Sequence, residues 1–291
     1  MTDNIGPGFS IIGSVLHPTD FSEGSLVAFN HALKTALLAR SKLTLLHVAD
    51  DDTSQWSDFP GVRETLERWG ALPAGSQKSD VGKLGVGVSK VMATEGEPVD
   101  AVLRYLEKNP ADLIVLSTSQ RGGHVPWLGK SVSAPMTRKA GEMTLLIPGD
   151  VEGFVSGVDG SIKLTKILIP IARSPRPEPA LHAAARFVRK MDVPEGTFTV
   201  LHVGDSNTMP ALHYPEVPGW TWKKEMRTGE VIGGIVNAAK DLKADLIIMS
   251  TDGRNGFLDV LRGSHSERLL RYNVAPLLTV PVGSRISRFL T

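Results

Sequence analysis

The stretch ADLIIMSTDGRNGFLDVLRGSHSERLLRYNVAPLLTVP, residues 244–281, decides how the second half of the chain folds. Leu246 to Met249 form a short apolar run of the buried-strand type, and Ser250 to Gly253 interrupt it with small polar residues and glycine. A helix is predicted to begin at Ser264, and Leu277 to Val280 predict a further strand. The stretch therefore predicts strand, loop, helix and strand in that order.

The loop between this strand and this helix has the composition of an anion site. Its small residues let a ligand approach the backbone, and the helix N-terminus at Ser264 offers free N–H groups and the positive end of its dipole. The natural ligand is a phosphate. An ordinary turn between a strand and a helix is the alternative that the loop alone leaves open.

The composition is that of a soluble globular protein with room for two ordinary domains in 291 residues. A net charge of +1, from 32 basic and 31 acidic residues, gives no electrostatic case for binding nucleic acid or an anionic membrane. No apolar run is long enough to span a bilayer, and the first ten residues lack a leader pattern, so we expect a cytoplasmic protein. The chain has no cysteine, which excludes disulfides and thiolate chemistry.

Internal repeats define the architecture. DLIVLS at residues 112–117 recurs as DLIIMS at 245–250, and LLIP at 145–148 recurs as LTVP at 278–281, both 133 residues later. LHV at 46–48 recurs 155 residues later, at 201–203. The chain is therefore predicted to contain two copies of one domain, the second of which lacks about 22 residues between its second and third strands.

Apolar strands alternate with amphipathic helices in each copy, which predicts an α/β fold: a five-stranded parallel sheet flanked by helices, with ligands at the carboxyl ends of the strands. We predict a first domain at 1–150, a linker at 151–163 and a second domain at 164–291. Asp159 and Gly160, flanked by Val158 and Ile162, predict a hairpin-like turn in the linker. The predicted first-copy strands lie near 11–16, 43–48, 86–92, 113–116 and 144–147, and the helices at 22–39, 62–69, 98–108 and 131–139.

The loop spacing resembles that of a known family. Ser250, two residues, Gly253, nine residues, Gly263 and Ser264 resemble the nucleotide loop of the universal stress proteins, in which a glycine stands where this chain has Ser250. HPTDFS at 17–22 is similar to the end of that family's first strand. The resemblance covers nearly the whole chain and implies two tandem Rossmann-like domains of the adenine nucleotide alpha hydrolase-like type, packed as a pseudo-dimer, with pairing of whole chains into a homodimer as a further expectation.

The resemblance also implies a ligand and the residues that bind it. The ligand is ATP, or ADP or AMP, with Mg²⁺ as a companion of the phosphates and Asp252 as its candidate ligand; no protein-only metal site is expected. A valine at the end of the second strand lies against the adenine, and an acidic residue after the first strand contacts the nucleotide. The implied second-copy residues are Pro170, Ile171, Val203, Met249, Ser250, Thr251, Gly253, Gly263, Ser264, His265 and Ser266; the weaker first-copy set is Pro18, Thr19, Asp20, Val48, Ser117, Lys130 and Ser131.

Neither copy keeps the whole pattern. The first copy has Asp20 but carries Gln120 and Lys130 at the positions of the loop glycines Gly253 and Gly263, and Lys130 either supplies charge or blocks the phosphates. The second copy has the loop but carries Ala172 in place of the carboxylate. Losing a charge-assisted hydrogen bond costs roughly 1.5 to 3 kcal/mol, which weakens binding without abolishing it. The nucleotide is therefore expected mainly in the second copy.

Several residues have two interpretations. His47 and His202 end equivalent strands, and a packed or hydrogen-bonded core role is favoured over metal binding or catalysis. A helix N-cap role for Asp20 or Ser22 competes with nucleotide contact. The proline- and aromatic-rich segment 205–222 is expected to pack over the other domain, with a lid or partner surface as the alternative.

The function that these features favour is a cytoplasmic stress-response protein that binds an adenine nucleotide without strong turnover. The alternative is a nucleotide-independent interaction scaffold whose sites are vestigial. A slow ATP hydrolase ranks last, because the sequence offers no identifiable base or activating group.

Overall fold

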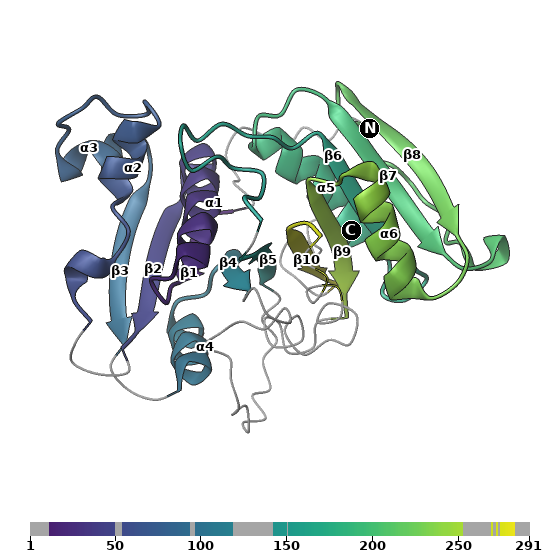
Figure 1. Ribbon diagram of the computed structural model, residues 1–291, viewed down its shortest axis with the longest axis horizontal. Coiled ribbons are helices and arrows are strands. Elements are labelled where there is room, and N and C mark those ends of the chain that lie inside the picture. The colour runs from purple at the N-terminus through teal and green to yellow at the C-terminus, as the bar shows by residue number, and fades with distance from the viewer. Residues whose placement is uncertain are drawn as a thin grey trace.

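The computed structural model describes residues 12–49, 54–93, 97–118, 142–149, 151–252, 269, 272 and 274–282 (Figure 1). None of the helices among these residues is both long and apolar enough to cross a membrane. In chain order the elements are β1 Ser14–Pro18, α1 Glu23–Ala39, β2 Lys42–Val48, the 3₁₀ helix η1 Trp56–Asp58, α2 Val62–Arg68, α3 Lys78–Lys83, β3 Gly87–Ala93, α4 Pro98–Lys108, β4 Leu113–Thr118, β5 Met143–Pro148, β6 Lys166–Ile171, α5 Glu178–Lys190, β7 Gly196–Val203, the 3₁₀ helix η3 Ser206–Thr208, β8 Trp220–Arg227, α6 Val231–Leu242, β9 Leu246–Thr251 and β10 Leu277–Pro281.

The strands form one ten-stranded sheet in the order β3-β2-β1-β4-β5-β10-β9-β6-β7-β8. All neighbours within each half are parallel, and the antiparallel pair β5 and β10 joins the halves edge to edge. Each half has the strand order 3-2-1-4-5 of a doubly wound domain. The predicted α/β fold with two five-stranded parallel sheets is confirmed.

An approximate two-fold axis relates the two halves. At the central pair, Leu145 lies opposite Leu278, its own equivalent at the repeat offset of 133 residues. Thr144 opposite Thr279 and Leu146 opposite Leu277 flank this pair symmetrically. The two copies are thus arranged in one chain as two subunits of a symmetric dimer would be.

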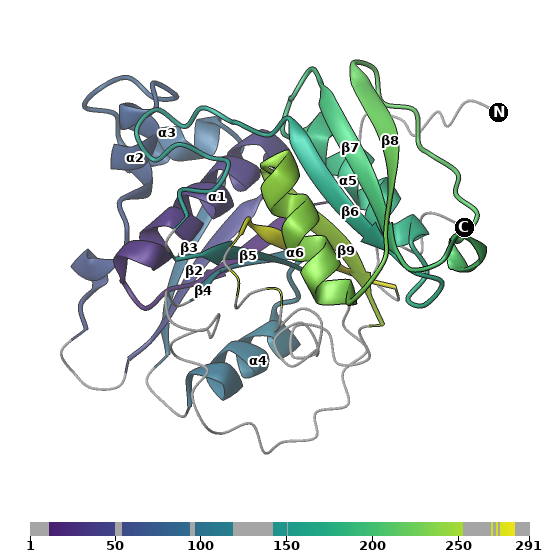
Figure 2. The same cartoon turned by 45° about the vertical axis from the view of Figure 1, so that its right-hand side comes forward.

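Helices cover both faces of the sheet. The helices α1, α2, α3 and α5 and the linker contribute to one buried cluster, whereas α4 and α6 contribute to a second cluster on the opposite face. Figure 2 shows α5 and α6 on opposite sides of β6 and β7. This two-sided cover explains why β4 and β5 are buried at every position instead of at alternate ones.

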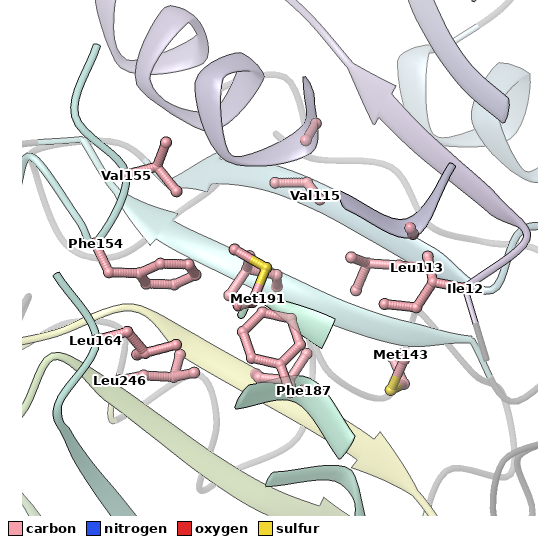
Figure 3. Close-up of a cluster of buried hydrophobic side chains, with 14 of the residues drawn as sticks. Ile12, Leu113, Val115, Met143, Phe154, Val155, Leu164, Phe187, Met191 and Leu246 are labelled. Atoms are coloured by element: carbon pink, nitrogen blue, oxygen red, sulfur yellow. The ribbon is translucent and has the colours of Figure 1, made fainter. Parts of the chain in front are cut away.

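The first buried cluster is continuous across the junction between the copies. Leu113, Val115 and Met143 from the first half lie near Phe187, Met191 and Leu246 from the second, with Phe154 and Val155 of the linker beside them (Figure 3). Phe154 is 1 % exposed and packs edge-on against both His31 of α1 and Phe187 of α5, with ring centroids 4.6 and 6.0 Å apart. The linker is therefore part of the core.

Local signals account for most element boundaries. The helix predicted at 98–108 matches α4, and the helix predicted at 22–39 begins one residue later because Ser22 is its N-cap, accepting the Ser25 N–H at 3.2 Å. The strand predicted at 11–16 is corrected to Ser14–Pro18, because Asp112 Oδ2 accepts the N–H groups of Gly13 and Ser14 before the ladder begins. Helix α3 was not predicted, and the helix predicted at 131–139 lies outside the described residues.

The linker forms the expected hairpin-like turn with different flanks. Its single bridge pairs Val155 with Ile162, not Val158 with Ile162, and Val158 is 74 % exposed. Gly160 has φ +69°, and the Asp159 carboxylate accepts the Ser161 N–H at 3.0 Å. Hydrogen bonds with Ser161 and Ser156 lower the pKa of Asp159 to about 2, so the turn carries a charge at neutral pH.

The second copy is shorter where the repeats predicted it to be. Residues 49–86 connect β2 to β3 and include α2 and α3, whereas only residues 204–219 connect β7 to β8, a difference of about 22 residues. An aromatic stack covers the sheet in place of the two helices: Trp222 stacks on Phe198 at 4.2 Å and on Tyr214 at 5.0 Å. The prediction that 205–222 packs over the other domain is wrong, because β8 is the far edge strand and the stack lies on β7 and β8 of its own half.

Removing this stack should destabilise the second half. We expect Trp222→Ala to lower the free energy of unfolding by about 2 kcal/mol, since a half-buried ring and the 2.9 Å hydrogen bond from its indole N–H to Pro215 O are lost together. Urea unfolding followed by circular dichroism measures it. The matched control is Trp56→Ala in the first copy, whose ring is 59 % exposed and should cost well under 1 kcal/mol. Equal effects of the two changes would contradict the structural role of the stack.

Candidate functional site

Each half of the sheet opens at its switch point, the place where the strand order reverses: β2 and β3 extend the sheet on one side of β1, and β4 and β5 extend it on the other. The strands β1 and β4 pair only through Val15–Leu113 and Leu16–Ile114, and β6 and β9 only through Ile167–Leu246 and Leu168–Ile247. Their carboxyl ends therefore separate beyond these pairs. In doubly wound folds the ligand crevice lies at this place, between the two loops that leave on opposite faces of the sheet.

The first-copy residues Pro18, Thr19 and Asp20 lie at the end of β1, beside this opening. Pro18 and Thr19 are buried, and Asp20 is half-buried. Asp20 Oδ1 accepts the Ser22 N–H at 3.0 Å and the Ser22 hydroxyl at 2.6 Å. The alternative of a helix N-cap role is thus correct for Ser22, which caps α1. Asp20 holds Ser22 in place by accepting these two hydrogen bonds.

The other described residues of the first-copy set lie on neighbouring strand ends. Val48 ends β2 and packs against the cluster that α4 covers. Ser117 is buried near the end of β4, next to Thr118. Lys130 and Ser131 lie outside the described residues, as does Gln120.

The second-copy residues Pro170 and Ile171 end β6, and Ala172, which follows them, is exposed to solvent. Met249, Ser250 and Thr251 end β9, and Asp252 follows exposed to solvent. The structure thus brings the carboxyl ends of β6 and β9 to one edge. Gly253, Gly263, Ser264, His265 and Ser266 lie outside the described residues.

Ser250, at the position of the first loop glycine, needs no glycine-like backbone. Its φ is not among the positive values of the chain, so a side chain fits there without strain. Its hydroxyl accepts the Ala180 N–H in the first turn of α5 at 3.2 Å. Because the N-cap of α5 is Pro177, which has no side-chain acceptor, Ser250 caps the helix from the neighbouring strand.

Val203 ends β7, where helix α6 approaches it closely. A Cβ atom on Gly234 would lie 2.9 Å from Val203 Cγ2, so only glycine allows this approach. Glu230 caps the same helix by accepting the Gly233 N–H at 2.5 Å. Val203 therefore has a fixed position at the edge where the resemblance expects an adenine ring.

Two equivalent threonines stand at the carboxyl ends of β4 and β9. Thr118 Oγ1 and Thr251 Oγ1 are buried and have no hydrogen-bond partner among the residues that the structure describes. The two residues are related by the repeat offset of 133 and stand at the two switch points. Thr118 was missed from the sequence, although the repeat that assigns Thr251 would have found it. A buried hydroxyl without a partner is an available donor for a ligand.

His47 and His202 connect strand ends. His47 Nδ1 lies 2.8 Å from Thr19 O and its Nε2 lies 3.1 Å from Ser54 Oγ, while His202 makes the same two links to Ile171 O at 3.3 Å and Thr208 Oγ1 at 2.8 Å. Both rings are buried. The favoured interpretation, a hydrogen-bonded core histidine, is confirmed, and each one fixes the loop that follows its own strand.

Metal and acid–base chemistry have limited support in these parts of the chain. Within the described ranges, no group of three or more histidine and carboxylate side chains could hold a metal ion. His17, buried beside the first-copy opening, has its pKa lowered to about 4, chiefly because burial disfavours its charged form. It is neutral at physiological pH and donates from Nδ1 to Val115 O at 2.9 Å.

A doubly wound α/β half-sheet with an open switch point and small polar residues at the strand ends defines a Rossmann-like domain, and this chain contains two of them. The model of the universal stress protein family matches residues 12–148 and 213–281. The chain belongs to the universal stress protein family.

Solved structures show the same fold over the whole chain. A universal stress protein from Archaeoglobus fulgidus DSM 4304 is 17 % identical, with a TM-score of 0.56, and the match covers 92 % of this chain and 96 % of that one. A Pseudomonas aeruginosa UCBPP-PA14 protein described as a universal stress protein is 12 % identical, with a TM-score of 0.52 and coverage of 96 % and 97 %. At these identities the likeness concerns the fold alone. No curated protein matches the chain in sequence.

Proposed function

We propose that the chain is a regulatory protein of the stress response that binds ATP or a related adenine nucleotide, mainly in its second copy. The observation that carries this proposal is the opening between β6 and β9, beside which the end of β7 brings Val203, and the end of β9 brings Ser250 and Thr251, to one edge of the sheet. Membership of the universal stress protein family is consistent with it.

The residues of the second copy suit the parts of a nucleotide unequally. Val203 offers an apolar surface for a flat base, and the unused Thr251 hydroxyl offers a hydrogen bond. The phosphates are assigned to the loop of Gly253, Gly263 and Ser264 on its sequence pattern. The carboxylate that Asp20 supplies in the first copy is absent, because Ala172 stands in its place. We therefore expect binding of intermediate strength.

Nucleotide content of the purified chain tests the proposal. The protein is denatured, and the supernatant is analysed on an anion-exchange column for ATP, ADP, AMP and cyclic AMP. About one adenine nucleotide per chain is expected, since one of the two sites has the near-complete loop. The double variant Gly253→Leu/Gly263→Leu should lose it, because side chains at both positions would fill the space for the phosphates.

A matched variant separates this effect from general damage. Gln120→Leu changes the equivalent loop position of the first copy and should keep the bound nucleotide. If nothing co-purifies and millimolar ATP with Mg²⁺ fails to raise the melting temperature, binding is excluded and the interaction scaffold with vestigial sites becomes the better description.

ATP hydrolysis is the third possibility, and the same protein tests it. Among the described residues, His17 is a buried histidine one position before the end of β1. Its ring is neutral and donates a hydrogen bond to Val115 O. We propose a binding protein without strong turnover. Linear phosphate release over many turnovers, abolished by Gly263→Leu, would overturn this and make the protein an enzyme.

A further inference from the structure

The two copies differ in charge at the same place beside their openings. The sheet register aligns them: Pro18 lies opposite Leu46 in the first copy, and Pro170 lies opposite the equivalent Leu201 in the second. Two residues further along, Asp20 therefore corresponds to Ala172, and Phe21 corresponds to Arg173. An acidic and an aromatic residue in one copy are replaced by an apolar and a basic residue in the other.

In the first copy this turn is closed by aromatic packing. Phe21 has φ +62° and stacks on His47 with ring centroids 4.0 Å apart, and Phe59 meets it edge-on at 5.2 Å. The positive charge of the second copy has no counterpart in this arrangement. Asp20 is thus the charged group that the first copy presents at the end of β1.

In the second copy the same turn presents an arginine. Arg173 is exposed, and its Nη2 donates to Asn207 O at 2.5 Å. Asn207 belongs to η3, which follows β7 and therefore Val203. The guanidinium thus bridges the turns after β6 and β7, at the carboxyl edge of the sheet. Among the described residues it forms no ion pair, and most of its five N–H donors remain for a ligand.

These two replacements change what the site can recognise. In doubly wound nucleotide sites a carboxylate binds the free ribose hydroxyls, whereas an arginine nearby accommodates a phosphate on the ribose. A carboxylate repels such a phosphate, so its loss at Ala172 and the gain of Arg173 act in the same direction. Resting on the proposed function, we infer that the second copy prefers an adenine nucleotide whose ribose carries a phosphate on its 2′ or 3′ oxygen.

The position of Arg173 favours this end of the nucleotide over the 5′ phosphates. It reaches toward the turn after β7, the strand that ends in Val203, and away from β9, after which the phosphate loop begins. The base, the ribose and the 5′ phosphates should therefore follow one another from β7 to β9. The planar guanidinium of Arg173 can bind two oxygens of one phosphate at once.

Calorimetric titration of the nucleotide-free full chain tests the inference. The probes are AMP, adenosine 2′,5′-bisphosphate, adenosine 3′,5′-bisphosphate and 3′,5′-cyclic AMP, which distinguish a free from a cyclised ribose phosphate. We expect at least one bisphosphate to bind about 10- to 100-fold more tightly than AMP. Arg173→Ala should reduce this ratio to about one while changing the affinity for AMP by no more than about 3-fold, and Arg173→Lys should give an intermediate ratio.

Two further variants control for charge and for folding. Arg189→Ala removes another arginine that donates to a backbone carbonyl, that of Glu216, but it lies in the last turn of α5 and should leave the ratio unchanged. Ala172→Asp restores the carboxylate and should favour AMP. If AMP and the bisphosphates bind equally well, or if Arg173→Ala keeps the preference, the inference is wrong while nucleotide binding stands. If none of the probes and no ATP binds, the proposed function fails with it.

Discussion

Lowering the pH from 7 to 5 is expected to lower the free energy of unfolding by about 4 kcal/mol through two buried histidines, His17 and His31. Burial lowers the pKa of each to about 4, from an ordinary value of 6.5. Natural domains are stabilised by about 5–15 kcal/mol in all, so this loss should be plain in any unfolding experiment.

His31 shows why the neutral form is required. Its Nδ1 donates to Val27 O at 2.8 Å, and its Nε2 accepts the N–H groups of Phe154 and Val155 at 3.0 and 3.2 Å. A proton on Nε2 would face two backbone donors and could not be accommodated. The linker is thus attached to α1 through an unprotonated nitrogen. Gly153 fits beside the ring because any Cβ there would lie 2.4 Å from Nε2.

His17 is constrained in a similar way at the first-copy opening. Its Nδ1 lies 2.9 Å from Val115 O, and its Nε2 faces Ser25 Oγ at 3.5 Å. Burial is the main cause of its lowered pKa, and the hydrogen bond to Val115 and the charge of Asp20 oppose it only in part. The site therefore contains a histidine that resists protonation.

The sign and the pH window follow from these values. Above pH 6.5 both histidines are neutral in the folded and unfolded chain, and their contribution is complete. Between pH 6.5 and 4 the unfolded chain binds the protons while the folded chain does not, which costs about 1.4 kcal/mol per pH unit for each ring. Below pH 4 both states are protonated and no further loss comes from these groups.

Urea unfolding at pH 7, 6 and 5 measures the effect against the double variant His17→Gln/His31→Gln. The variant should be less stable at pH 7, because it lacks the hydrogen bonds of the rings, but its stability should fall about 4 kcal/mol less between pH 7 and 5. Carboxylates titrate in both proteins and cancel in this comparison. Parallel losses in the two proteins would show that neither histidine is the source.

The sequence predicted the parts of this protein that depend on local pattern. The repeats at 112–117 and 245–250 place equivalent strands, and in the structure their registers agree residue by residue. The boundaries of α4 follow from Pro98 at its start and from apolar residues at helical spacing. Such features need no knowledge of the other half of the chain.

Long-range packing accounts for what the sequence did not predict. The segment 205–222 contains many large apolar groups, but nothing in it indicates that Trp222 stacks on Phe198 of its own half. Ser250 was expected only as a small loop residue, and its capping of α5 depends on a helix 70 residues away in the sequence. The sequence does not single out Arg173, because its importance arises from its contact with Asn207 in the turn after β7, which only the three-dimensional arrangement gives.

The junction between the copies should be the most sensitive part of the core. Phe154→Ala is expected to lower the free energy of unfolding by about 3–5 kcal/mol, since it removes a fully buried ring that contacts His31 of the first half and Phe187 of the second. The cavity would lie between the halves, where β5 pairs with β10 over three residue pairs, the one strand pairing between the halves in the described part of the chain.

The position of the cavity distinguishes this change from an ordinary core truncation. If Phe154 couples the two halves, Phe154→Ala should broaden the unfolding transition or split it into two, whereas Phe154→Leu should retain one transition with a smaller loss. Val158→Ala, four residues further along the linker and largely exposed, is the control and should change stability by less than about 0.5 kcal/mol. A single sharp transition and a loss below about 1 kcal/mol in Phe154→Ala would mean that the sheet edge alone joins the copies.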